Sequence, residues 1–166
     1  PVTVERPCTP IISRSFNSEE SSENTTSSKF SFNAPVISGI AIVHGNTEIE
    51  NDAFDGNFSD KNAEDIVQLT GIKKRNHIDS SQDILSLATE AAKQVLEETG
   101  TDVQDLEAII CSTGTPDMIT PSLACRVLNN LTTENKPVMI QANDINAACS
   151  GYIYGLQNAH DILNHK

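Results

Sequence analysis

The sequence contains no tryptophan, and its 11 basic residues are outnumbered by 23 acidic ones. The resulting formal net charge of −12 argues against a nucleic acid or an anionic membrane as the main partner. No apolar run approaches the roughly 20 residues needed to cross a bilayer, and residues 1–33 lack the apolar stretch of a signal peptide. We therefore expect a cytoplasmic protein that binds neither nucleic acid nor membrane.

Cysteine is scarce and not clustered. The four cysteines, Cys8, Cys111, Cys125 and Cys149, show neither the CxxC spacing of a zinc site nor the density of a disulfide framework. No metal site is expected. Cys111 and Cys125 lie in apolar patterns and are expected to be packing residues, because a free cysteine behaves as a small buried hydrophobe.

The chain divides into two parts by composition. Residues 1–33 are rich in Ser, Thr, Asn and Glu and have no sustained hydrophobic period, so we expect a disordered linker there. The folded part is expected over 34–166. Because the first residue is proline rather than methionine, we expect the chain to come from a longer polypeptide.

Hydrophobic periodicity predicts alternating strands and helices from residue 34 onward. Strands are expected at 34–45, 106–113 and 137–146. Helices are expected at 62–69 with Gly71 as a cap, from an N-cap at Ser80 or Ser81 to a stop at Gly100, from Pro121 to Leu131, and over 150–163. This order favours an α/β fold with a parallel sheet covered by helices, in which ligands bind at the carboxyl ends of the strands.

Cys149 is expected at such a strand end, just before the last helix. Unpaired backbone amides and the positive end of the helix dipole would favour the thiolate form there. Ala147, Ala148 and Gly151 keep the surroundings small, so a thioester could reach the sulfur, and a backbone amide could donate to the resulting oxyanion. From the local pattern alone, Cys149 could equally be a small apolar residue at a tight turn.

Four segments carry a resemblance to a known family: "DIVQLTGIKKRNHI", "LATEAAKQVLEETG", "AIICSTGTPDMITPSLACRVLNNL" and "DINAACSGYIYGL". In order and spacing they resemble the N-terminal portion of the ketoacyl-ACP synthase III family, condensing enzymes of the thiolase fold. The last segment looks like the family's active-site segment. The resemblance runs from about Val36 to the end of the chain and implies the N-terminal half of a thiolase-like fold.

The resemblance implies a chemistry for Cys149. As the nucleophile it would take an acyl group from acyl-CoA or from an acyl carrier protein, and a carbanion, commonly from malonyl carrier protein, would then attack the acyl-enzyme. Its backbone amide would form part of the oxyanion hole. The resemblance further implies fatty-acid or polyketide biosynthesis, a homodimer, and no bound cofactor.

The chain departs from the family's pattern in its length. It stops at Lys166, about halfway through the family's fold, so the histidine and asparagine of the second half would have to come from a remaining half on the same gene or on a second chain. None of the four histidines, His44, His77, His160 and His165, matches the family's catalytic position. Each is expected to be a surface or packing residue.

A second departure concerns recognition of the donor. Where members that use free acyl-CoA commonly carry a tryptophan and an arginine, this chain has Asp65 and Leu69. A donor delivered by a carrier protein is therefore favoured over free CoA. Lys73, Lys74 and Arg75 form the one basic cluster; it is either a solvated surface or a contact for the phosphate or the acidic helix of the carrier.

Three functions remain open. The first is an acyl-thioester condensing enzyme or acyltransferase of ketoacyl synthase III type. The second is a non-catalytic half-fold or degenerate homologue that acts as a dimerisation or scaffold partner. The third is a branching enzyme resembling hydroxymethylglutaryl-CoA synthase, which has the same fold.

Overall fold

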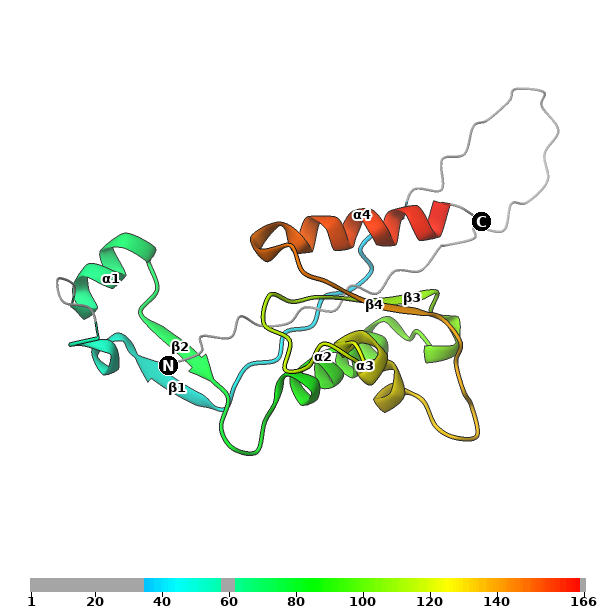
Figure 1. Cartoon of the computed structure of the whole chain (residues 1–166), viewed down its shortest axis with the longest axis horizontal. Helices are drawn as coiled ribbons and strands as arrows, with labels where there is room; N and C mark the ends of the chain where they lie inside the picture. The colour runs from blue at the N-terminus through cyan, green and yellow to red at the C-terminus, as the bar shows by residue number, and fades with distance from the viewer. Residues whose placement is uncertain (1–34, 58–61, 165–166) are drawn as a thin grey trace, which may run out of the picture.

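Two parallel strands, β3 (Ala108–Ser112) and β4 (Gln141–Ile145), form the centre of the fold. The computed structural model describes residues 35–57 and 62–164, so the linker predicted over 1–33 lies outside the described residues (Figure 1). Ala108 pairs with Gln141 at one end and Ser112 with Ile145 at the other. The two strands therefore end at the same edge, and the parallel pairing predicted from the sequence is confirmed.

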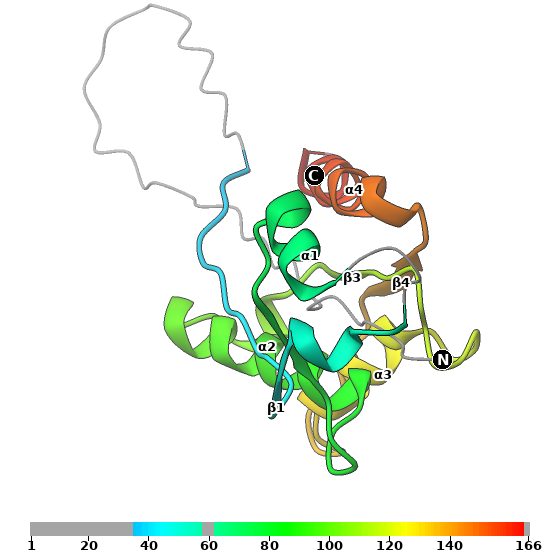
Figure 2. The ribbon, with the colours of Figure 1, turned by 90° about the vertical axis from the view of Figure 1, so that its left-hand side faces the viewer.

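Helices cover both faces of this strand pair. Helices α2 (Ile84–Thr99) and α3 (Leu123–Leu131) pack against each other on one side, and α4 (Gly151–Asn164) lies on the other (Figure 2). Strand β3 buries Ile109, Ile110 and Cys111 in succession, as expected for a strand covered on both faces. Leu123 and Val127 of α3 complete the core and are at most 1% exposed.

The helix ends follow capping rules that the sequence only partly indicated. Gly71 and Gly100 end α1 (Ala63–Thr70) and α2 in the left-handed conformation, with φ of 72° and 63°, as predicted. The N-cap of α2, however, is Asp83 rather than Ser80 or Ser81. Ser81 instead donates to Asp79 from its backbone amide at 2.7 Å.

A second, antiparallel sheet was not predicted. It pairs β1 (Thr47–Glu50) with β2 (Lys74–His77), and the short 3₁₀ helix η1 (Asn51–Phe54) and α1 lie between them in the chain. Figure 1 shows this unit to one side of the β3–β4 pair. The strand sequences TEIE and KRNH are mostly charged or polar and are largely exposed, so they lack the apolar alternation that marks a half-buried strand.

The strand predicted over 34–45 is wrong for the described residues 35–44, which run without regular secondary structure. Val36, Ile37, Ile40 and Ile42 are each about 60% exposed. The β-branched residues favour an extended chain, but strand assignment requires a hydrogen-bonded neighbour, and none in the described part of the chain pairs with this segment. Instead it runs against α2, where a Cβ on Gly39 would lie 2.6 Å from Thr99 Cγ2.

Candidate active site

Cys149 lies in the turn that joins β4 to α4. After Ile145 the chain enters a single 3₁₀ turn, η3 (Ala148–Ser150), and continues directly into α4 at Gly151. The thiol is free, and the residue is exposed to solvent. The predicted position of Cys149, at the carboxyl end of a strand and the start of a helix, is thus confirmed, with the 3₁₀ turn as an addition.

The backbone of this turn is strained at Ala148, the residue before the cysteine. Ala148 has a φ of 46°, in the left-handed region that residues with a Cβ seldom adopt. Non-glycine residues with such angles persist where the surrounding structure holds them, and they cluster at functional sites. This conformation reverses the chain between β4 and α4 and presents the next residue, Cys149, at the surface.

Gly151 holds the start of α4 close to β3. It is buried, and a Cβ built on it would lie 2.3 Å from Ser112 Oγ and 3.6 Å from Ser112 Cβ. Gly151, Gly155 and Ala159 are the buried residues of α4 and recur every fourth position, so the helix packs on the strands through a face of small residues. The close packing of α4 on β3 therefore fixes the position of Cys149, which lies in the turn directly before this helix.

The backbone around Cys149 supplies hydrogen-bond donors. The first bond of η3 runs from Ser150 N to Ala147 O at 3.0 Å, so the Cys149 N–H precedes it and has no partner within the helix. A donor of this kind, beside an exposed sulfur, suits an oxyanion formed by attack on a carbonyl.

The loop between β3 and α3, residues 113–122, begins beside the cysteine turn. Thr113 N donates to Ile145 O at 3.1 Å, and the Cβ direction of Gly114 points to Asn146 Oδ1 at 3.9 Å. The predicted Pro121 position in the first helical turn is wrong by two residues, because Ser122 is the N-cap and Leu123 begins α3. Further along, Arg126 donates to Asp117 at 2.7 Å, which holds the pKa of that carboxyl below its ordinary value.

Asp144 was not singled out from the sequence. Its carboxylate accepts hydrogen bonds from Leu123 N at 2.7 Å and from Ala124 N at 2.9 Å. An aspartate inside a partly buried strand, five residues before the cysteine, is the signal that could have indicated it, since a carboxylate there needs backbone or charged partners.

The basic cluster lies in the β1–β2 unit rather than in the cysteine turn. Lys74 forms an ion pair with Glu48 at 2.7 Å, and this hydrogen bond raises the pKa of Lys74. Arg75 donates to Asn51, and its guanidinium carbon lies 5.6 Å from the centre of the Phe54 ring. Among the described residues, no ion pair involves Lys73, which is exposed.

The other cysteines and histidines have no catalytic arrangement in the described part of the chain. Cys111 is 2% exposed in the core, as predicted, whereas Cys125 is exposed on α3 and its thiol points to Ala142 O at 3.5 Å. It lines a groove of about 580 Å³ whose lining does not include Cys149. His44 and His160 are exposed, and His77 packs against Phe54 with ring centres 6.2 Å apart. Cys8 and His165 lie outside the described residues.

Among the residues that the structure describes, no three His, Cys, Asp or Glu side chains gather as a metal site would require. Within the same residues, no helix has the length and apolar character to span a membrane.

Solved structures define the class of fold. A 3-oxoacyl-ACP synthase III from Aquifex aeolicus is similar with a TM-score of 0.66 and 33% identity, over 75% of this chain and 39% of that one. A beta-ketoacyl-ACP synthase III from Thermus thermophilus gives 0.65 and 27%, over 75% and 37%. The priming beta-ketosynthase of the R1128 polyketide pathway gives 0.60 and 26%, over 72% and 34%. The fold is thus thiolase-like, as predicted.

Sequence comparison finds relatives of the same kind as the solved structures. The chain is 38% identical over 127 residues to a beta-ketoacyl-ACP synthase III from Clostridium beijerinckii, and 45% identical over 104 residues to one from Caldanaerobacter subterraneus. Over these residues the chain is similar to beta-ketoacyl-ACP synthases III. It spans 38% and 30% of the lengths of these two relatives, and no family model matches it.

Proposed function

We propose that Cys149 is the nucleophile of an acyl-thioester condensing enzyme of ketoacyl synthase III type. The observation that carries the proposal is the exposed thiol in a strained turn, between the end of β4 and the start of α4, with the Cys149 N–H ahead of the first helical hydrogen bond. The relatives named above are beta-ketoacyl-ACP synthases. Their shared fold supports the same chemistry for this chain.

The first half-reaction needs only groups in this turn. The sulfur attacks the thioester carbonyl carbon, and the carbonyl oxygen becomes an oxyanion stabilised by the backbone amide. When the carbon–oxygen double bond re-forms, the bond to the donor sulfur breaks. The donor leaves as a thiol with the proton that Cys149 gives up. The products are acyl-Cys149 and free CoA or free carrier thiol.

The second half-reaction requires groups that the described residues do not place beside the thiol. A carbanion must form and attack acyl-Cys149, and the described histidines lie in α4, in β2 or beside β1 rather than beside the thiol. We propose that a histidine and an asparagine from a remaining half of the fold, on the same gene or on a second chain, serve that step in a homodimer. Fatty-acid or polyketide biosynthesis follows from the same proposal.

We also propose a carrier protein as the donor, with contact through the basic cluster. Lys74 is paired with Glu48 and Arg75 with Asn51. Lys73 is therefore the residue of the basic cluster best able to bind a phosphate or an acidic helix. Leu69 is 68% exposed, and the Asp65 carboxylate accepts from the backbone amide of Asn62, the N-cap of α1. Neither residue therefore offers CoA a cation or an indole ring.

Mass spectrometry of the intact protein tests these proposals. After incubation with acetyl-CoA or acetyl carrier protein, we expect one acetyl adduct on the unchanged chain and on Cys125→Ala, which removes the other exposed thiol. Cys149→Ala should take none. An adduct that persists in Cys149→Ala refutes the nucleophile, and no adduct on any chain supports the non-catalytic partner. Lys73→Glu should slow acylation by the carrier and leave acylation by acetyl-CoA unchanged.

A further inference from the structure

Both ends of the loop 113–122 are fastened to two consecutive residues of β4. At the start of the loop, Thr113 N donates to the backbone oxygen of Ile145 at 3.1 Å. At its end, Leu123 N and Ala124 N donate to the carboxylate of Asp144 at 2.7 and 2.9 Å. The loop is thus closed at its base by the strand that leads to Cys149.

The Asp144 contacts are additional to the ordinary cap of α3. Ser122 already caps the helix locally, since its side chain accepts from Cys125 N at 3.2 Å. Asp144 accepts from the first two amides of the helix instead, and it is 20 and 21 residues away in the sequence. Hydrogen bonds to a charged carboxylate are stronger than neutral ones, and the positive end of α3 favours them. The contacts therefore join α3 to β4.

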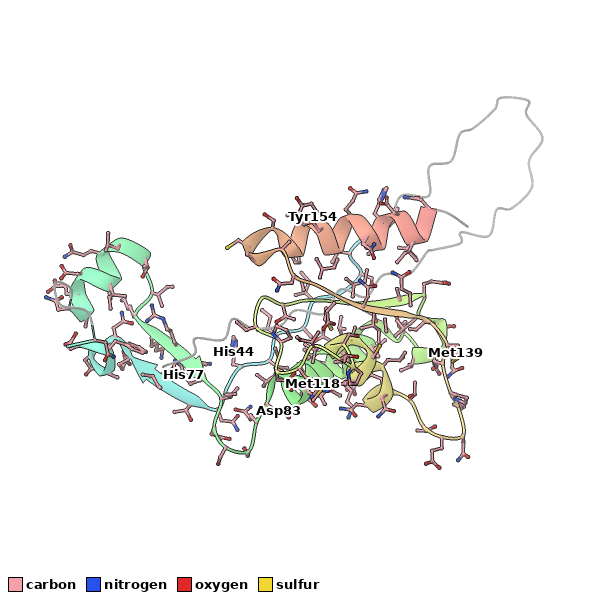
Figure 3. All side chains as sticks on the ribbon, in the orientation of Figure 1. His44, His77, Asp83, Met118, Met139 and Tyr154 are labelled. Carbon is pink, nitrogen blue, oxygen red and sulfur yellow. The ribbon has the colours of Figure 1, made fainter. Side chains whose placement is uncertain are left out.

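Burial does not hold the loop in place. Residues 114–121 are all exposed, including Met118 at 43% and Ile119 at 93% (Met118 is labelled in Figure 3). The polar anchors are the two contacts with β4 and the Asp117–Arg126 ion pair. A loop with so little buried apolar surface takes its position from such anchors.

We propose that Asp144 is a positioning residue for the reaction at Cys149. By fixing the end of loop 113–122 to β4, it keeps the start of the loop, at Thr113 and Gly114, beside Asn146 and the turn that carries the thiol. The loop then forms one side of the approach of a thioester to Cys149. This role rests on the proposed function of Cys149, and it assigns to Asp144 no contact with the substrate.

The test compares Asp144→Asn with Asp102→Asn in the full chain. Both variants replace a carboxylate that accepts from backbone amides, but Asp102 caps the remote 3₁₀ helix η2 (Val103–Asp105) through Gln104 N at 3.0 Å. The substitution at Asp144 keeps the shape and removes one acceptor. Three rates are measured well below the unfolding temperature: acetylation of Cys149 by acetyl carrier protein, its alkylation by iodoacetamide, and amide hydrogen exchange over 113–124.

For Asp144→Asn we expect acetylation to slow about tenfold, the effect of losing one hydrogen bond to a charged group. Alkylation by the small reagent should stay within about twofold, and exchange over the loop should accelerate. Asp117→Asn should give a weaker change of the same kind, less than additive with Asp144→Asn because both hold one loop. Asp102→Asn should change none of the three rates.

Several outcomes would overturn the proposal. A lower unfolding temperature with unchanged acetylation and loop exchange would make Asp144 a structural residue only. Equal slowing of acetylation and alkylation would mean that the thiol itself has moved. If the unchanged chain takes no acetyl group, the proposed function fails, and loop exchange alone decides the role of Asp144. Should Asp144→Asn fail to fold, Asp117→Asn decides, because the 39% exposed side chain of Asp117 tolerates replacement.

Discussion

Replacing Gly151 by alanine tests the packing that fixes the start of α4. The new Cβ would lie 2.3 Å from Ser112 Oγ, far inside contact distance, and 3.6 Å from Ser112 Cβ, which is ordinary contact. The clash therefore involves the hydroxyl alone. Gly151 has helical backbone angles, φ −57° and ψ −36°, so an alanine is conformationally acceptable there.

The expected free energies follow from two opposing effects. Overpacking a filled site costs about 1–3 kcal/mol, and replacing glycine by alanine in a helix gains up to about 1 kcal/mol. Gly151→Ala alone should therefore destabilise the chain by about 0–2 kcal/mol. In a Ser112→Ala background the hydroxyl is gone, and the same change should stabilise by up to about 1 kcal/mol, so the coupling is about 1–3 kcal/mol.

Urea unfolding of the unchanged chain, both single variants and the double variant gives this coupling as a double-mutant cycle. Gly100→Ala is a matched glycine control: nothing lies within 4 Å of its Cβ direction, and its cost, set by its φ of 63°, should be the same with or without Ser112. Equal effects of Gly151→Ala in both backgrounds would show that α4 does not rest on Ser112 as described.

Three further predictions concern neighbouring features. Ala148→Gly relieves a left-handed alanine whereas Ala147→Gly, at φ −136°, relieves nothing, so the first variant should be more stable by about 1–2 kcal/mol in urea unfolding; equal stabilities would contradict the strain. The pKa of Asp117 is lowered in the folded chain, so its ion pair with Arg126 should contribute about 0.5 kcal/mol to the free energy of unfolding above pH 4. This contribution should be lost as the pH falls through the folded pKa. Asp117→Asn should remove this pH dependence of stability, and the control Asp105→Asn should not. Tyr152, Ile153 and Tyr154 are 43–62% exposed on α4, and Tyr154 points away from the strands in Figure 3, so light scattering should show association of the chain that Ile153→Glu weakens; a monomeric unchanged chain would contradict this.

The central elements could be predicted because their sequence signals coincide with their tertiary role. The apolar positions of α2 recur at helical spacing and pack on α3, and Gly100 ends the helix where a left-handed residue is needed. The short apolar run at 106–113 became β3, which is buried on both faces. In each case local preference and burial favour the same structure.

The remaining features depend on contacts between distant segments. Strands β1 and β2 pair through the segments TEIE and KRNH. Neither the composition nor the periodicity of these segments indicates that pairing. Residues 35–44 have the composition of a strand, yet a strand also requires a neighbour. The position of Cys149 could be predicted from a local pattern. The φ of Ala148, the Gly151–Ser112 contact and the hydrogen bonds from α3 to Asp144 arise only in the assembled fold.

The parallel pairing of β3 with β4 has a consequence for when the site forms during folding. Ala108 meets Gln141 only after α3 and the intervening loops have closed, so the pairing carries the entropy cost of a long loop and belongs to the slower events of folding. This pairing is needed for the hydrogen bonds that join loop 113–122 to β4 and for the packing of α4 against Ser112. A partly folded chain therefore holds a cysteine without its oriented amide and without its flanking loop, and reactivity toward thioesters should arise together with the last cooperative step of folding.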